Sequence, residues 1–154
     1  MDYQLQVITV SVSDVDRAAA FYTKQAGFTL DVDYHPASAF RVVQLTPPGS
    51  ACSVQIGAGL TDAPPGLARA TYLTVTDIEA AHCELTARGV TVSGIRHKSP
   101  IDGWTGDWKP GPDPERRNYA SFADFTDPDG NTWVLQEIGH RVGATPAAAD
   151  GGSH

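Results

Sequence analysis

Two stretches of the chain alternate apolar and polar residues with the period of a β-strand and match each other position by position. The first runs from Ile8 to Asp16, and the second, 63 residues later, runs from Thr71 to Glu79. Each contains a Ser-Asp or Thr-Asp pair where the alternation ends, and Asp is a good helix N-cap because its carboxylate accepts amide hydrogens of the next turn. The pattern therefore predicts a duplicated unit in which a strand leads into a helix.

A helix and three further strands are expected in each half. The first helix is predicted at 15–26 and the second at 78–88, because Gly27 and Gly89 readily take the left-handed conformation that ends a helix. The strands that follow are predicted at 28–32, 40–45 and 53–57 in the first half and at 91–95, 119–125 and 131–138 in the second. The element order is therefore βαβββ, twice.

Two tandem βαβββ modules predict an α+β fold, in which a mixed sheet curls into a cup and the helices cover its outer face. The apolar side of the first strand, with Val10 and Val12, is expected to pack on the helices. The mixed side is expected to line the cup, although exposure of that side to solvent is the alternative. The predicted boundaries are a single domain at 1–142, module one at 4–58, a linker at 59–69, module two at 70–140 and a flexible tail at 143–154.

The segment 97–118 is the clearest difference between the halves. It is rich in Pro, Gly and Asp and carries Trp104 and Trp108. A long segment without predicted structure is usually functional or disordered, so we expect a lid over the cup, with packing on a partner chain as the alternative. Arg116 and Arg117 are expected either to bind a ligand carboxylate or to pair with acidic residues of the same segment.

Composition narrows the function classes. The 154 residues fit one domain, and 41% hydrophobic with 19% charged residues is typical of a globular protein. The net charge of −7 and the lack of a basic stripe argue against nucleic acid and membrane surfaces, and no long apolar run or signal peptide is recognisable, so a cytoplasmic protein is expected. Cys52 and Cys83 are expected to be reduced and largely buried, without a zinc site.

Two motifs carry a resemblance to a known family. The first is Val-Ser-Asp-Val-Asp-Arg at 12–17 followed by Phe21-Tyr22 and Gly27-Phe28, and the second is Asp-Pro-Asp-Gly-Asn-Thr-Trp-Val-Leu at 127–135. The chain resembles the vicinal oxygen chelate superfamily, the glyoxalase/bleomycin-resistance/extradiol-dioxygenase group, over about residues 4–140. The resemblance implies the fold described above but leaves function open, since this scaffold carries lyases, isomerases, dioxygenases, epimerases and drug-sequestering proteins.

The resemblance also implies positions for a divalent metal, which the family holds with His and Glu at the bottom of the cup. In this sequence those positions are Val7, Gln55, Ala70 and Val134. Only Gln55 has a donor atom, and one neutral amide cannot hold a catalytic divalent ion. We therefore predict no metal or other cofactor, with a relocated metal site as the alternative. Glu137 lies on the opposite strand face from Val134 and is expected at the surface or at a dimer contact.

The predicted ligand site is the mixed face of the cup together with the two loop tryptophans. Its lining is apolar with a few hydroxyls and amides, which suits a drug-sized organic molecule. The residues assigned to it are Val7, Thr9, Gln55, Ala70, Tyr72, Trp104, Trp108, Val134 and Gln136.

Catalytic motifs are missing from the sequence: it has neither a GxSxG nucleophile elbow nor a glycine-rich nucleotide loop. If the protein is an enzyme, the acid–base candidates are the loop residues His35, His97, Asp102 and Asp107.

The leading hypothesis is a metal-independent protein that binds an aromatic or polycyclic metabolite. The alternatives are a lyase, isomerase or dioxygenase of the same fold, using a relocated metal or loop acid–base residues, and a regulatory module with a vestigial cup. A homodimer is expected, because the sheet edges are otherwise free to pair.

Overall fold

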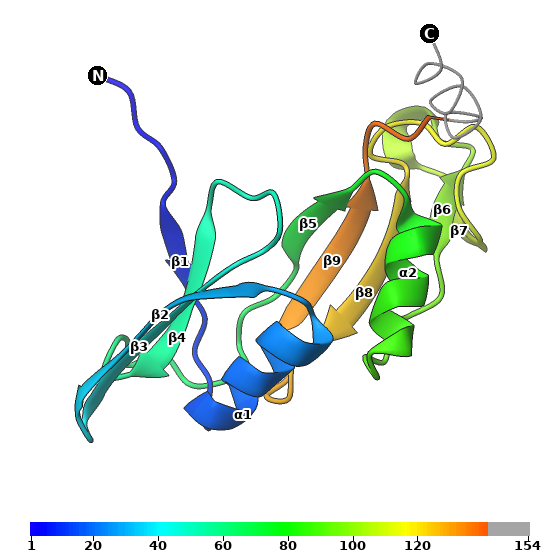
Figure 1. Ribbon diagram of the computed structural model, residues 1–154. Coiled ribbons are helices and arrows are strands. Elements are labelled where there is room, and N and C mark those ends of the chain that lie inside the picture. Colours follow the sequence, from blue (N-terminus) through cyan, green and yellow to red (C-terminus); the bar gives the residue numbers. More distant parts are fainter. Residues whose placement is uncertain (142–154) are drawn as a thin grey trace, which may run out of the picture. The chain divides into compact units, whose positions relative to one another are not determined.

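The computed structural model describes residues 1–141, so the predicted tail at 143–154 lies outside the described residues. The first module contains β1 (Val7–Thr9), α1 (Val15–Ala20), the π-helix η1 (Phe21–Gln25), β2 (Thr29–Ala37), β3 (Phe40–Thr46) and β4 (Ser53–Ala58). The second contains β5 (Thr71–Val75), α2 (Ile78–Ala87), β6 (Arg96–Ser99), the 3-10 helix η2 (Asp102–Trp104), β7 (Asp107–Pro110), β8 (Ser121–Thr126) and β9 (Thr132–Glu137) (Figure 1).

Both sheets have the same strand order, which confirms the duplicated unit. The first sheet is ordered β1-β4-β3-β2, and the second is ordered β5-β9-β8-β6-β7, with β7 added at its edge. β1 pairs with β4 in parallel, while β4 with β3 and β3 with β2 are antiparallel. The predicted α+β fold of two βαβββ modules is therefore correct.

The chain divides into two compact units. The first consists of residues 1–71, 84–92 and 125–133, and the second consists of 72–83, 93–124 and 134 onwards. No helix within residues 1–141 is long and apolar enough to cross a membrane.

Both predicted helix starts are correct. The Asp14 side chain accepts a hydrogen bond from the backbone N–H of Arg17 at 3.0 Å, and α1 begins directly after this cap. The Asp77 carboxylate accepts hydrogen bonds from the second and third residues that follow it, both at 3.1 Å. These bonds satisfy amide groups that have no partner inside the first helical turn. The two helical segments end as expected before Gly27 and Gly89, with φ of 82° and 87°.

The prediction of one α-helix over 15–26 is wrong in its second half. The α-helix ends at Ala20, and Phe21–Gln25 form a π-helix in which the N–H of Ala26 donates to the carbonyl of Phe21 at 2.9 Å. The π turn contains two adjacent aromatic residues, Phe21 and Tyr22, which are both buried. A 3.6-residue period cannot predict this widened turn, because the burial of both rings depends on partners from distant parts of the chain.

The core of the first unit is an aromatic cluster that joins the two family-like motifs. The ring of Trp133 lies 5.7 Å from Tyr22, 5.7 Å from Phe28 and 6.2 Å from Phe125, centroid to centroid. Trp133 is 1% exposed, which confirms its predicted position on the helix side of the last strand. The Tyr22 hydroxyl donates to Asp127 at 2.7 Å and accepts from the Trp133 indole N–H at 3.0 Å. These aromatic residues of the two motifs therefore stabilise the core of the first unit.

The second module departs from prediction around its second strand. The expected strand at 91–95 is wrong: Val92 makes only an isolated bridge to Phe125, and β6 begins at Arg96. The segment 97–118 is consequently not structureless, because β6 and β7 form an antiparallel hairpin within it. The sequence of β6, Arg-His-Lys-Ser, has no apolar alternation, so only its pairing with neighbouring strands makes it a strand.

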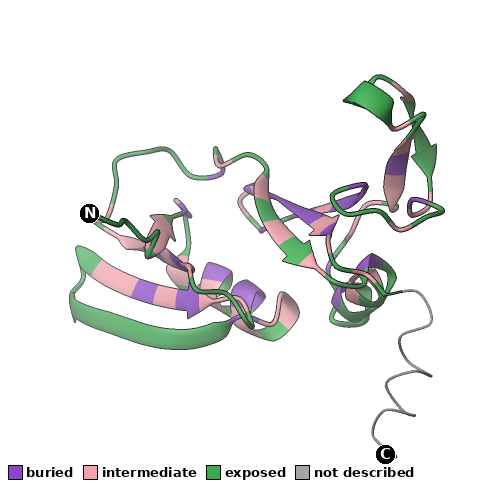
Figure 2. Cartoon of the chain, turned by 90° about the horizontal axis from the view of Figure 1, so that it is seen from above, coloured by how far each residue is buried: buried purple, intermediate pink, exposed green. Residues whose placement is uncertain are grey.

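Burial agrees with prediction for the first strand and disagrees for one cysteine. Val10 and Val12 are buried and Thr9 is exposed, as expected. Cys52 is half-buried, but Cys83 is exposed, because it lies off the helix stripe that buries Ile78 and Leu85. Figure 2 shows the edge strand β2 exposed along its whole length.

Candidate functional site

Strand pairing places four side chains on one face of the sheet in the second unit. In β6, Arg96 lies opposite Phe122 of β8, and Lys98 lies opposite Trp108 of β7. Residues directly opposite each other in an antiparallel pair, and residues two apart in a strand, share a face. Arg96, Lys98, Trp108 and Phe122, with Trp104 from η2, are called the aromatic face below.

The two tryptophans of the aromatic face pack on the same ring. Trp104 meets Phe122 edge to face at 6.1 Å and 71°, and Trp108 does so at 5.5 Å and 87°. Phe122 is thereby reduced to 8% exposure, whereas Trp104 and Trp108 keep 45% and 46% of their surface exposed. Large aromatic rings that are half open to solvent are typical of surfaces that receive another molecule.

Two cations lie beside the tryptophan of β7. The Arg96 guanidinium carbon is 4.9 Å from the Trp108 ring centre and 5.9 Å from that of Phe122, and Lys98 Nζ is 4.9 Å from Trp108. Arg96 also pairs with Asp124 through two contacts, at 3.0 and 3.1 Å. These contacts hold the hairpin side chains against the aromatic rings.

The other predicted ligand residues are distributed over both units. In the second unit Tyr72 is exposed, Val134 is buried, and Gln136 donates to the carbonyl of Tyr119 at 3.2 Å. The four assigned residues of the first unit are Val7, Thr9, Gln55 and Ala70, of which Val7 and Gln55 are half-buried and the other two are exposed. The Gln55 amide donates to the Thr9 hydroxyl at 2.7 Å, so these two polar side chains satisfy each other.

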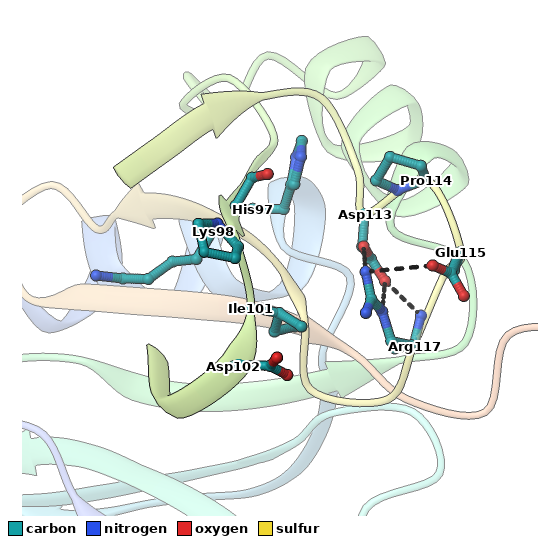
Figure 3. A pocket seen from close by; sticks show the side chains of 10 residues that line it. His97, Lys98, Ile101, Asp102, Asp113, Pro114, Glu115 and Arg117 are labelled. Carbon is teal, nitrogen blue, oxygen red and sulfur yellow. Dashed lines mark hydrogen bonds and ion pairs between the residues drawn. The ribbon is translucent and has the colours of Figure 1, made fainter. Parts of the chain in front are cut away.

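A cavity of about 250 Å³ lies beside β6 (Figure 3). We call it the His97 cavity. Its lining is His97, Lys98, Ser99, Pro100, Ile101, Asp102, Asp113, Pro114, Glu115 and Arg117. Two of the four catalytic candidates, His97 and Asp102, therefore line the same cavity.

The remaining catalytic candidates do not line the His97 cavity, and three of the four candidates lie in strands where loops were expected. His35 lies inside β2 of the first unit, exposed, and not in a loop after it. Asp107 is exposed and opens β7. His97 likewise belongs to β6 and is 8% exposed, whereas a loop position was expected. The unpredicted hairpin is the reason for both errors in this segment.

The hydrogen bonding of His97 defines its tautomer. Its Nδ1 lies 2.7 Å from the backbone carbonyl of Gly111, which can only accept a hydrogen bond. Nδ1 therefore carries the proton, and Nε2 of the neutral ring has a free lone pair. An imidazole held in this way is able to accept a proton or a hydrogen bond from a molecule in the cavity.

Another part of the cavity lining is an ion pair between the buried carboxylate of Asp113 and the partly exposed guanidinium of Arg117. Asp113, which is 0% exposed, accepts hydrogen bonds from Arg117 at 2.7 and 2.8 Å, and the hydroxyl of Ser121 accepts the Asp113 backbone N–H at 2.9 Å. The hydrogen bonds from Arg117 lower the pKa of Asp113 to about 2. Arg117 also contacts Glu115 at 3.8 Å, which confirms the predicted pairing within this segment.

The prediction of Glu137 as a surface carboxylate is wrong. It is 0% exposed and accepts hydrogen bonds from Arg116 at 2.6 and 2.8 Å and from the N–H of Ile78 at 2.9 Å. Burial by itself raises the pKa of Glu137, but these bonds outweigh it and lower the pKa below its ordinary value. The alternation placed Glu137 correctly on the face opposite Val134, but it could not show that a guanidinium would cover it.

The residues present do not fit the divalent metal that the family implies. Val7, Ala70 and Val134 offer no donor at the family positions. One other group within residues 1–141, Asp77, Glu137 and His140, brings potential ligand atoms within 4.8 Å of one another. Arg116 contacts Asp77 at 3.5 Å and Glu137 at 2.6 Å, so a guanidinium already supplies the positive charge there. The carboxylate oxygens that would coordinate a cation are therefore already engaged in ion pairs with Arg116.

Sequence reasoning missed the residues that connect the aromatic face. Phe122 lies inside a predicted strand. Alternation alone would have placed its side chain on the strand face opposite to that of Ala123 and Phe125, away from the helices. Arg96 and Lys98 gave no such signal, because the strand that orients them was not predicted.

Comparison with known proteins gives the family. The model of the Glyoxalase/Bleomycin resistance protein/Dioxygenase superfamily matches residues 4–135. No curated protein sequence matches the chain significantly.

Three solved structures have the same fold. TnmS3, an antibiotic binding protein from Streptomyces sp. CB03234, is 29% identical with a TM-score of 0.66, over 88% of this chain and 96% of that one. A glyoxalase/bleomycin resistance protein from the same strain is 29% identical with a TM-score of 0.64, over 86% and 99%. A superfamily member from Sphaerobacter thermophilus DSM 20745 is 28% identical with a TM-score of 0.66, over 89% and 98%. The chain therefore belongs to the Glyoxalase/Bleomycin resistance protein/Dioxygenase superfamily.

Proposed function

We propose that this protein binds a small aromatic organic molecule on the aromatic face, without a metal. The observation that carries the proposal is the pair of half-exposed tryptophans, Trp104 and Trp108, packed edge to face on Phe122. Each indole is held in place by Phe122 and leaves ring surface for a second aromatic molecule. Stacking on rings that are already oriented avoids much of the entropy cost of ordering them.

Two further observations support binding over metal chemistry. The family metal positions carry side chains that do not fit a divalent ion, as described above. Among solved structures with similar folds, TnmS3 is described as an antibiotic binding protein. A drug-sized aromatic or polycyclic ligand matches the two indoles better than a small inorganic ion does.

The double variant Trp104→Ala/Trp108→Ala tests the proposal. Isothermal titration with 2-naphthalenemethanol as the aromatic probe is expected to show binding weakened by about 1–3 kcal/mol, on the scale of truncated aromatic anchors. The melting temperature is expected to fall by no more than about 4 °C, because half-exposed side chains contribute little to folding.

Trp133→Phe is the matched control, because it removes a tryptophan from the buried cluster of the first unit. It is expected to lower the melting temperature while leaving the probe affinity of the folded protein unchanged. A large fall in the melting temperature of the double variant, with unchanged affinity, would show that Trp104 and Trp108 are structural and would contradict the proposal.

We also propose that the protein acts in the cytoplasm as a homodimer. The nine-residue edge strand β2 supports this, because it is exposed throughout and carries apolar side chains at Leu30, Val32 and Tyr34. Long apolar edge strands are usually covered by another strand or chain. Light scattering is expected to give twice the chain mass of 16.3 kDa, and a constant monomer mass over a range of concentrations would refute the dimer.

Acid–base catalysis in the His97 cavity is the second candidate function. It is favoured by the Nε2 lone pair of His97 in a cavity of about 250 Å³ that Asp102 also lines. The two functions separate by mutation, because His97→Gln would abolish turnover of a substrate but not probe binding by Trp104 and Trp108.

A further inference from the structure

We propose that the aromatic face selects ligands that carry a carboxylate on a planar aromatic ring, and that Lys98 is the residue that holds the carboxylate. This inference rests on the proposed function and adds to it the charge of the ligand. It assigns a specificity-determining role to a side chain outside the predicted ligand site.

The charge balance of the aromatic face leaves one cation free. Arg96 is paired with Asp124 through both of its terminal nitrogens, at 3.0 and 3.1 Å, so its charge is largely compensated. Lys98 has no carboxylate within ion-pair distance among residues 1–141. The face therefore carries one excess positive charge, although the whole chain has a net charge of −7.

The position of the free cation matches that of a ring substituent. Lys98 Nζ lies 4.9 Å from the centre of the Trp108 ring, and the same ring is 46% exposed. The ammonium group lies over this ring, so the edge of an aromatic molecule that packs on the remaining exposed surface of Trp108 would come close to it. An ammonium offers three donors, and a carboxylate at that edge would accept from them in a charge-assisted hydrogen bond.

The negative side chains of the hairpin are directed elsewhere. Strand register places Asp107 opposite Ser99 and Lys109 opposite His97, so both lie on the face away from Trp108. Figure 3 shows the side chain of Lys98 extending away from Asp113, Glu115 and Arg117 of the His97 cavity. Asp124, the acidic partner of Arg96, is thus the carboxylate that the register brings to the aromatic face.

Three probes that differ only in charge test the inference. Isothermal titration of the full chain with 2-naphthoate, 2-naphthalenemethanol and 2-naphthylmethylammonium compares an anion, a neutral molecule and a cation with the same ring. We expect 2-naphthoate to bind about tenfold more tightly than 2-naphthalenemethanol, because the anion gains one charge-assisted hydrogen bond. We expect 2-naphthylmethylammonium to bind most weakly of the three. Added salt is expected to reduce the preference for the anion.

Lys98→Met is expected to abolish the preference for 2-naphthoate and to leave the affinity for 2-naphthalenemethanol within about twofold, since Met keeps the apolar stem of the side chain. Lys98→Gln, which retains a polar side chain, is expected to do the same. Lys109→Met is the matched control: it removes the same charge from the opposite face of the same hairpin and should leave the preference unchanged.

The outcomes separate the inference from the proposed function. Equal binding of 2-naphthoate and 2-naphthalenemethanol, tighter binding of the ammonium probe, or an equal loss of preference in Lys109→Met would overturn the role of Lys98 while the proposed function stood. If none of the three probes binds to the wild-type chain, the proposed function itself is wrong.

Discussion

Arg116→Met is expected to destabilise the protein by about 3–5 kcal/mol, because it leaves the carboxylate of Glu137 buried without its guanidinium partner. Glu137 is 0% exposed, and two of its three hydrogen bonds come from Arg116. Urea unfolding at pH 7, followed by circular dichroism, measures the change. Such a loss would be a large part of the stability of a domain of this size.

Acid pH is expected to reduce the defect of Arg116→Met. In the wild-type protein the pKa of Glu137 is lowered, so its ion pair contributes fully above the unfolded value of about 4.3 and is lost as the pH falls. In the variant the buried carboxylate loses its arginine and keeps only His140, 3.7 Å from Oε2, as a basic neighbour, so we expect burial to raise its pKa above the unfolded value. Protonation of Glu137 then removes the cost of burying its charge in the variant. The difference in unfolding free energy between the two proteins therefore shrinks from pH 7 towards pH 4.

Two variants control this experiment. Arg88→Met removes an exposed arginine and is expected to change stability by less than about 0.5 kcal/mol. The double variant Arg116→Met/Glu137→Gln removes both charges and keeps an amide oxygen for the N–H of Ile78, so it is expected to recover much of the loss. A single variant as stable as the wild type would show that Glu137 does not depend on Arg116.

Tyr22→Phe is expected to destabilise the protein by about 2–4 kcal/mol, although it removes one oxygen atom. The hydroxyl donates to Asp127 and accepts from the indole N–H of Trp133. The substitution therefore leaves the buried indole N–H without an acceptor and removes one hydrogen-bond donor from the buried Asp127 carboxylate. An unpaired buried donor costs about 1–3 kcal/mol, and more where a charged group is involved. Burial, with the nearby charge of Asp127, raises the pKa of Tyr22, which keeps the hydroxyl protonated.

Tyr34→Phe is the matched control for Tyr22→Phe. Tyr34 is 57% exposed and packs on Phe40 through its ring, so loss of its hydroxyl is expected to have an effect within about 0.5 kcal/mol. Thermal and urea unfolding of both variants decide the comparison. Equal stability of the two variants would mean that the contacts of the Tyr22 hydroxyl add nothing to folding.

The sequence by itself determined the repeated architecture. Strand alternation, the N-caps Asp14 and Asp77, and the glycines that end the helices depend on residues within a few positions, so they are readable without the fold. The same local logic placed Trp133 on the helix side of its strand. The substitution of the family's metal positions by Val7, Ala70 and Val134 is also a property of the sequence alone.

Only the tertiary structure decided the features that depend on a partner far along the chain. The hairpin of β6 and β7 has too little apolar alternation to be predicted, and its pairing alone brings Lys98 to Trp108 and His97 to the cavity that Asp102 lines. Glu137 has the polarity of a surface residue. It is buried because Arg116, 21 positions away, supplies both charge and hydrogen bonds, and no short-range pattern encodes that compensation.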